Sequence, residues 1–150
     1  MPYSASVVVV DVANVMGARP DGWWRDRAGA ALRLYREVAA LARRDDSPAG
    51  AWVLVLEGRA REATASVRDE NLPADDDAPG ADWVPSEDES APVRVVSAPG
   101  SGDDAIVGVV AEVVARGESC LVVTADRELR RRCEQLHASV VGPRWLLGLL

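Results

Sequence analysis

The chain has 150 residues, of which 48% are hydrophobic, and its net charge is −7. It contains no lysine, so all 17 basic residues counted as Lys or Arg are arginines. This length provides one domain with a buried core and excludes two ordinary domains. No apolar run is long enough to span a membrane and none resembles a secretion signal, so we expect a cytoplasmic protein. The two cysteines, Cys120 and Cys133, have no disulfide-framework spacing, which predicts buried thiols in a reducing compartment.

Apolar runs and helical spacing alternate along the chain. Ser6–Val10 and Ala51–Leu56 are continuous apolar runs, as in strands buried on both faces of a parallel sheet. Shorter strands are expected at Val93–Val96, Cys120–Val123 and Ser139–Val141. Apolar stripes and turn signals predict helices over Trp23–Arg44, Arg59–Arg68, Asp103–Arg116, Asp126–Leu136 and Pro143–Leu150. The alternation predicts one doubly wound α/β domain, a three-layer α/β/α arrangement around a central parallel sheet.

The acidic charge is concentrated in one segment, Asp69–Pro92. Nine acids and no arginine lie between Asp69 and Ser90, which leaves 15 acids against 17 arginines in the rest of the chain. The segment is rich in Pro, Asp, Glu and Ser, so we interpret residues 69–92 as a mobile loop or insertion. One hypothesis is that it acts as a tethered polyanion that covers a basic face and limits access to it.

Acidic residues follow each of the first four predicted strands. Asp11 ends the first strand and Glu57 the second, Asp103 and Asp104 follow the third, and Asp126 follows the fourth. Ligands of parallel sheets bind at the carboxyl ends of the strands, where these side chains would meet. Gathered carboxylates repel one another unless a cation neutralises them, and oxygen ligands suit Mg²⁺ or Mn²⁺. The alternative is that each acid is a local helix cap or turn residue.

A second alternative is dinucleotide binding. Gly100–Ala105 contains Gly-x-Gly-x-x-Ala between a predicted strand and helix, with Asp126 about twenty residues on, a partial match to that fingerprint. Asp103 and Asp104 would then face a pyrophosphate at a helix start, where negative side chains are unfavourable. Asp11 would also be left without a role, so this interpretation ranks below the metal site.

Four segments together resemble the PIN-like nuclease superfamily, more narrowly the NYN group and its YacP-like branch. VVVVDVANV at Val7–Val15 is similar to the NYN opening strand, and SGDDAIV at Ser101–Val107 and VVTADREL at Val122–Leu129 are similar to acidic segments of related flap-type 5′ nucleases. VLEG at Val55–Gly58 matches a strand end that carries aspartate in the relatives, so Glu57 departs from the pattern. The resemblance implies strand order 3-2-1-4-5 and metal-dependent cleavage of RNA. Some YacP-like proteins act on messenger RNA at the ribosome, which is an analogy for this chain.

The resemblance also implies roles for the acids. Asp11, Asp104 and Asp126 are expected to hold the essential Mg²⁺ or Mn²⁺, while the remaining acids bind a second ion or orient water. Asn14 is expected to fix the turn after the first strand and to hydrogen-bond a ligand carboxylate. The full set of predicted metal ligands is Asp11, Glu57, Asp103, Asp104, Asp126 and Glu128. Hydrolysis would then use a metal-activated water in an in-line attack on phosphorus.

Arginines near the same edge are candidates for contact with the RNA backbone, because guanidinium groups bind phosphate in a bidentate manner. One of Trp23 and Trp24 is expected to stack on a base. The alternative is that these charges are simply solvated. The predicted substrate-binding arginines are Arg19, Arg25, Arg27, Arg59 and Arg61.

A catalytically silent RNA-binding or interaction module is the main alternative function. The sequence argues against it, since no strand-end acid is replaced by a neutral residue. The apolar tail Trp145–Leu150 can pack on its own sheet or against a second copy, which leaves a monomer and a homodimer open. The RNA target, internal or terminal cutting, and DNA as a substrate also stay open.

Overall fold

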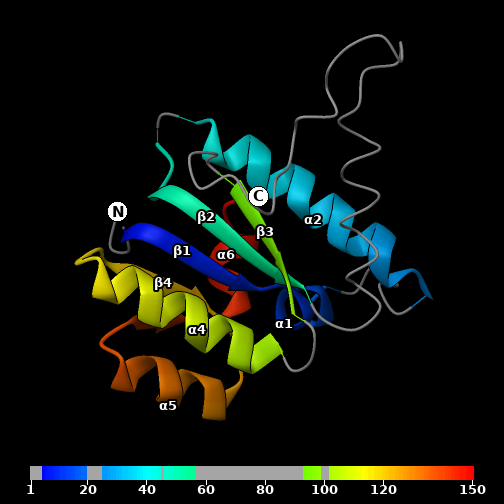
Figure 1. Cartoon of the computed structure of the whole chain (residues 1–150). Helices are drawn as coiled ribbons and strands as arrows, with labels where there is room; N and C mark the ends of the chain where they lie inside the picture. Colours follow the sequence, from blue (N-terminus) through cyan, green and yellow to red (C-terminus); the bar gives the residue numbers. More distant parts are fainter. Residues whose placement is uncertain (1–4, 20–24, 45, 57–92, 99–101) are drawn as a thin grey trace, which may run out of the picture.

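The structure, a computed structural model, describes residues 5–19, 25–44, 46–56, 93–98 and 102–150 (Figure 1). The predicted helix Arg59–Arg68 and the acidic segment Asp69–Pro92 lie outside the described residues. The strands are β1 Ala5–Asp11, β2 Ala49–Leu56, β3 Val93–Ser97, β4 Cys120–Val123 and β5 Ser139–Val141. The helices are α1 Val12–Gly17, α2 Arg27–Ala42, α4 Gly102–Ala115, α5 Arg127–Gln135 and α6 Pro143–Leu147.

The strands form one parallel sheet in the order β3-β2-β1-β4-β5, which confirms the predicted fold class and strand order. β1 is central, and its Val8 lies between Trp52 of β2 and Leu121 of β4. Continuous runs of valine suit this position because β-branched side chains pack well on a pleat that is buried on both faces.

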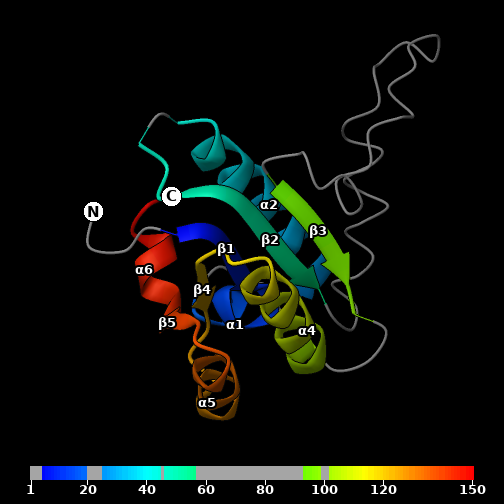
Figure 2. The ribbon, with the colours of Figure 1, turned by 60° about the vertical axis from the view of Figure 1, so that its left-hand side comes forward.

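Helices cover both faces of the sheet, which confirms the expected three layers (Figures 1 and 2). Alternate residues of β1 point to opposite faces. Val8 and Val10 belong to a core cluster with α1, α2 and α6. Val7 and Val9 belong to a second cluster with α4 and α5. The central strand therefore supplies apolar side chains to two cores.

Two helix starts differ from the sequence prediction, and capping explains both. Helix α1 was not predicted, and its six residues are too few to show a helical period. It begins directly after β1 because the Asp11 side chain accepts a hydrogen bond from the Asn14 N–H. Helix α2 begins at Arg27 instead of Trp23, since Asp26 caps it by accepting from the Gly29 N–H.

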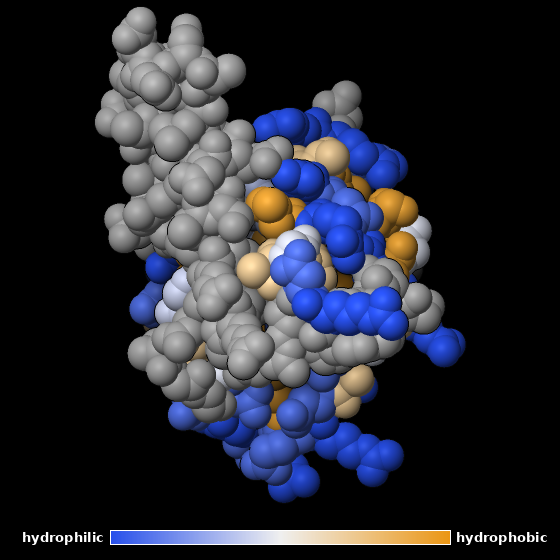
Figure 3. Space-filling view, turned by 90° about the vertical axis from the view of Figure 1, so that its right-hand side faces the viewer, coloured by the Kyte–Doolittle hydropathy of each residue, from blue (hydrophilic) through white to orange (hydrophobic). Residues whose placement is uncertain are grey.

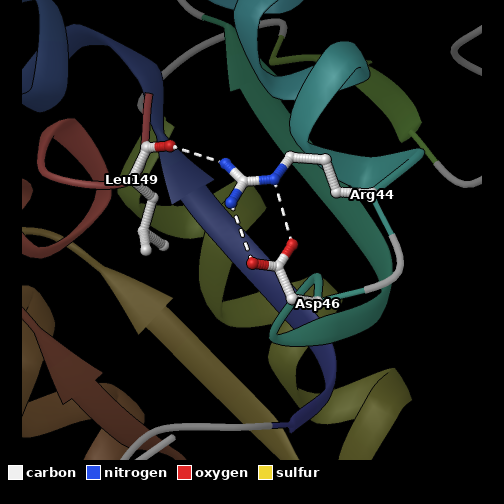
Figure 4. A network of polar contacts seen from close by, with 3 residues as sticks. All are labelled: Arg44, Asp46 and Leu149. Carbon is white, nitrogen blue, oxygen red and sulfur yellow. Dashed lines mark hydrogen bonds and ion pairs between the residues drawn. The ribbon is translucent and has the colours of Figure 1, made fainter.

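The carboxyl-terminal tail packs on its own sheet. Trp145 of α6 stacks on Trp52 of β2 with ring centroids 6.5 Å apart. Arg44 donates two hydrogen bonds to Asp46, of 3.0 and 2.8 Å, and a longer one of 3.4 Å to the Leu149 carbonyl (Figure 4). The side-chain hydrogen bonds from Arg44 hold the pKa of Asp46 below its usual value.

No helix in the described ranges is long and apolar enough to cross a membrane.

We predict that Trp52→Ala lowers the free energy of unfolding by about 3–5 kcal/mol, because it empties a fully buried site and removes the stack on Trp145. Urea denaturation measures the change. Leu150→Ala is the control, since Leu150 is 36% exposed and its loss should cost less than about 0.5 kcal/mol. Equal effects of the two substitutions would contradict the packing described above.

The two free cysteines predict a pH effect on stability. Burial raises the pKa of Cys120 to about 12 and that of Cys133 to about 11. Unfolded thiols ionise near pH 8.5, so their contribution to stability is complete below that pH and is lost as the pH rises through these values. We expect the urea midpoint to fall between pH 8.5 and 10, and to fall less in the Cys120→Ala/Cys133→Ala variant. The same slope in both proteins would show that the thiols are not the cause.

Candidate active site

The predicted site residues come from elements that end or begin at one edge of the sheet. β1 and β4 are adjacent, with Val10 paired to Val123, so Asp11 and Thr124 follow side by side. α1 and the beginning of α4 lie at the same edge (Figure 1). Figure 3 shows the side toward which β1 runs, where hydrophilic side chains prevail among the described residues.

Asp11 is the buried acid of this edge, with 9% of its surface exposed. Its Oδ2 accepts a 2.9 Å hydrogen bond from the Thr124 hydroxyl, and its Oδ1 accepts a 3.3 Å hydrogen bond from the Asn14 N–H. Both bonds fix the orientation of the Asp11 carboxyl group. The central strand therefore ends in a carboxyl group that the fold holds in place.

Thr124 also lies at this edge, and it is not among the site residues predicted from the sequence. It is fully buried, and its hydroxyl both donates to Asp11 and accepts from the Asp126 N–H at 3.1 Å. Its own N–H donates to the Val141 carbonyl of β5. The available signal was a hydroxyl directly after the apolar strand Cys120–Val123, where it must be buried and hydrogen-bonded.

Asn14 makes two hydrogen bonds at this edge. Its side-chain Oδ1 accepts a 2.8 Å hydrogen bond from the Ala125 N–H, while its backbone N–H bonds the Asp11 carboxylate. The amide side chain thus connects α1 to the loop after β4. The expected hydrogen bond from Asn14 to a carboxylate is thus present through its backbone N–H, and its side chain adds the contact with Ala125.

Asp103 and Asp104 lie in the first turn of α4 and differ in environment. Adjacent helical positions diverge by about 100°. The Asp104 side chain is 75% exposed and accepts a 3.0 Å hydrogen bond from Arg132 of α5. Asp103 is half-buried. Burial is the main reason that the pKa of Cys133 in α5 rises to about 11, while the charge of Arg132 lowers it and the charges of Asp103, Glu134 and Asp11 raise it.

The two acids after β4 take different positions in α5. Asp126 is the N-cap, with its Oδ1 accepting a 3.0 Å hydrogen bond from the Leu129 N–H. Asp126 is thus a helix cap, as the alternative interpretation expected, and the capping bond uses one of its two carboxylate oxygens. Glu128 is exposed and lies 3.9 Å from Arg131 on the same helix.

The described residues contain no group of three His, Cys, Asp or Glu side chains that could hold a metal ion. Asp11, Asp104 and Asp126, the three expected to share the essential ion, are therefore not gathered into one cluster. The physical reason is that Asp104 turns outward to Arg132 and Asp126 turns toward its own helix. Glu57 lies outside the described residues.

The donor chemistry nevertheless suits a hard divalent cation. Asp11 and Asp103 offer only oxygen atoms, and Mg²⁺ commonly binds through one or two carboxylates together with water and substrate phosphate. In kind, these oxygen donors match the preference of Mg²⁺ and Mn²⁺.

The predicted RNA-contacting arginines are only partly described. Arg19 forms a bidentate ion pair with Glu37 of α2, at 2.7 and 2.8 Å, so its guanidinium is engaged within the fold. Arg25 is exposed just before α2. The structure does not describe the other predicted RNA contacts, which are the Arg27 side chain, Arg59, Arg61, Trp23 and Trp24.

Comparison with known proteins gives a likeness in fold. No family model and no curated protein matches this chain. Among solved structures, the crystal structure of Rae1 (YacP) from Bacillus subtilis, a W164L mutant, is similar with a TM-score of 0.64 at 14% sequence identity. The match covers 95% of this chain and 72% of that one. The chain therefore has a YacP-like α/β fold.

Proposed function

We propose that this chain is a metal-dependent ribonuclease that hydrolyses RNA phosphodiester bonds. The observation that carries the proposal is the buried Asp11 carboxylate, oriented by Thr124 at the carboxyl end of the central strand. Ligands bind at this edge in parallel α/β sheets. The YacP-like fold and the acidic motifs along the chain support the same activity.

In this proposal, Asp11 and Asp103 hold a Mg²⁺ or Mn²⁺ ion. When bound, such an ion supplies Lewis-acid chemistry and a nucleophilic water at neutral pH. Asp126 has one carboxylate oxygen beyond its capping bond, and Asp104 becomes available when Arg132 releases it. Glu57 and Glu128 stay predicted ligands of a second ion.

The chain's own residues hold the Asp11 carboxylate in position and offer positive charge to the phosphates of the substrate. Thr124 and the Asn14 N–H hold the Asp11 carboxylate still, and the Asn14–Ala125 bond keeps α1 against the loop after β4. Arg132 places a guanidinium beside the start of α4, where it can donate to a substrate phosphate. Outside the acidic segment the arginines outnumber the acids, which favours a polyanionic substrate. Ribosome association and a homodimer stay predictions.

A catalytically silent RNA-binding module is the second candidate. The observation that favours it is that no three metal-ligating side chains gather within the described ranges. Labelled single-stranded RNA separates the two functions, because only the enzyme cleaves it when Mg²⁺ or Mn²⁺ is added. Binding that is independent of metal and leaves the RNA intact would replace the ribonuclease with the module.

We predict that Asp11→Asn and Asp103→Asn each lower metal-dependent RNA cleavage by at least about 100-fold, since each removes an anionic ligand worth several kcal/mol in the transition state. Asp104→Asn should have a smaller effect, because Asp104 is exposed and paired with Arg132. Glu112→Gln, an exposed acid on the same helix, is the control with unchanged activity. A larger loss in Asp104→Asn than in Asp103→Asn would assign the metal to Asp104 instead.

We predict that Thr124→Val lowers cleavage by about 10–100-fold and raises the Mg²⁺ concentration needed for half-maximal activity, because it frees the Asp11 carboxylate to rotate. Thr124→Ser keeps the hydroxyl and should restore both quantities. Thr124→Val should also lower the free energy of unfolding by about 1–3 kcal/mol, since a buried acceptor loses its donor. A loss of stability without any change in the Mg²⁺ midpoint would mean that Thr124 is only structural.

A further inference from the structure

A pocket borders the candidate site on the α1 and α6 side of the sheet. It is an open pocket of about 630 Å³, within the range of about 300–1,000 Å³ that small-ligand sites occupy. Its walls are mostly small residues from three separate parts of the chain, Ala13, Gly17, Ala18, Ala125, Gly142 and Pro143. Such walls expose backbone and methyl groups, so a flat ring can approach closely.

Two polar side chains also line this pocket, Asn14 and Arg144. The Asn14 Oδ1 is held by the Ala125 N–H, which directs the amide Nδ2 elsewhere, and no described residue accepts a hydrogen bond from it. Arg144 is exposed, and no carboxylate in the described part of the chain pairs with it. Asn14 and Arg144 thus add to the pocket lining one neutral amide and one cation that no described carboxylate pairs with.

We propose that this pocket binds one nucleotide of a single-stranded RNA substrate, with the base on the small residues and the adjoining phosphate on Arg144. The inference rests on the proposed ribonuclease function, which it extends by giving the substrate a position. Asn14 joins the two sites, because its backbone N–H bonds the Asp11 carboxylate while its side chain lines the pocket. A base seated here places its strand beside Asp11.

The chemistry of the pocket favours a nucleotide over a purely apolar ligand. A guanidinium binds phosphate through paired N–H donors, and an amide N–H donates to base or ribose oxygens. An apolar ligand would leave both groups without an acceptor, and an inorganic anion would leave the small-residue walls unused. Bases of single-stranded RNA are unstacked and can enter such a pocket.

The first test is a titration of ¹⁵N-labelled protein, in EDTA, with adenosine and uridine 5′-monophosphate, ribose 5-phosphate and inorganic phosphate. We expect the nucleotides to shift the amide signals of Ala125 and Gly142 and the side-chain NH₂ of Asn14. Ribose 5-phosphate should bind at least tenfold more weakly. Equal binding of ribose 5-phosphate or inorganic phosphate would reduce the site to an anion contact and overturn the base pocket, as would an absence of shifts.

Substitutions at Gly142 test the effect of a negative charge in the pocket, because Asp and Asn have nearly the same shape and differ in charge. A Cβ added there meets nothing within 4 Å, and its φ of −80° and ψ of 167° suit any residue. Gly142 is the N-cap of α6, and as a glycine it provides no side-chain capping bond. Asp and Asn are both favourable residues at an N-cap. We expect Gly142→Asp to bind uridine 5′-monophosphate at least tenfold more weakly than Gly142→Asn, with thermal midpoints within a few degrees of each other. Equal affinities in the two variants would contradict a phosphate on this side of the pocket.

Arg144→Gln should also weaken nucleotide binding at least tenfold, while Arg131→Gln, at an exposed arginine outside the pocket, should not. Because binding is measured without metal, the two proposals fail separately. Metal-dependent cleavage without nucleotide binding in the pocket overturns this inference alone. Nucleotide binding that Gly142→Asp abolishes, in a protein that cleaves no RNA, supports the pocket and overturns the ribonuclease.

Discussion

The hydrogen bond between Thr124 and Asp11 is the contact on which the geometry of the candidate site depends. A carboxylate with 9% exposure is unfavourable unless it is bonded, and the fully buried hydroxyl of Thr124 provides that bond. The same hydroxyl accepts from the Asp126 N–H, and Asn14 adds a second link through Ala125. No buried side-chain nitrogen or oxygen among the described residues lacks a partner. The ends of β1 and β4 are therefore locked together by polar contacts above an apolar core.

The sheet was predictable because its signal is local and strong. Val7–Val10 is a run of four β-branched residues with no polar residue, a pattern typical of a strand buried on both faces. Strand order came from the family resemblance, since periodicity carries no information about which strands are neighbours. The missed helix α1 is six residues long, and its start depends on one capping carboxylate.

The site was predictable only as a set of strand ends. The sequence places Asp103 and Asp104 side by side, and the direction in which each points follows from a helical rotation and from Arg132, 28 residues away. Thr124 was missed because its partner Asp11 is 113 residues distant, and such a pair leaves no local pattern. Asp126 fits a cap and a ligand equally well by sequence, since the same side chain can serve either role.

The ion pair between Arg132 and Asp104 has a further consequence for a charged edge. Its side chains are 36% and 75% exposed, and pairs this open are worth less than about 1 kcal/mol. The pair is accordingly opened at little cost in free energy, and opening it leaves one guanidinium and one carboxylate in solvent at the start of α4. Mobile ions screen such contacts over about 8–10 Å, so the strength of this pair depends on the ionic strength of the solution around the protein.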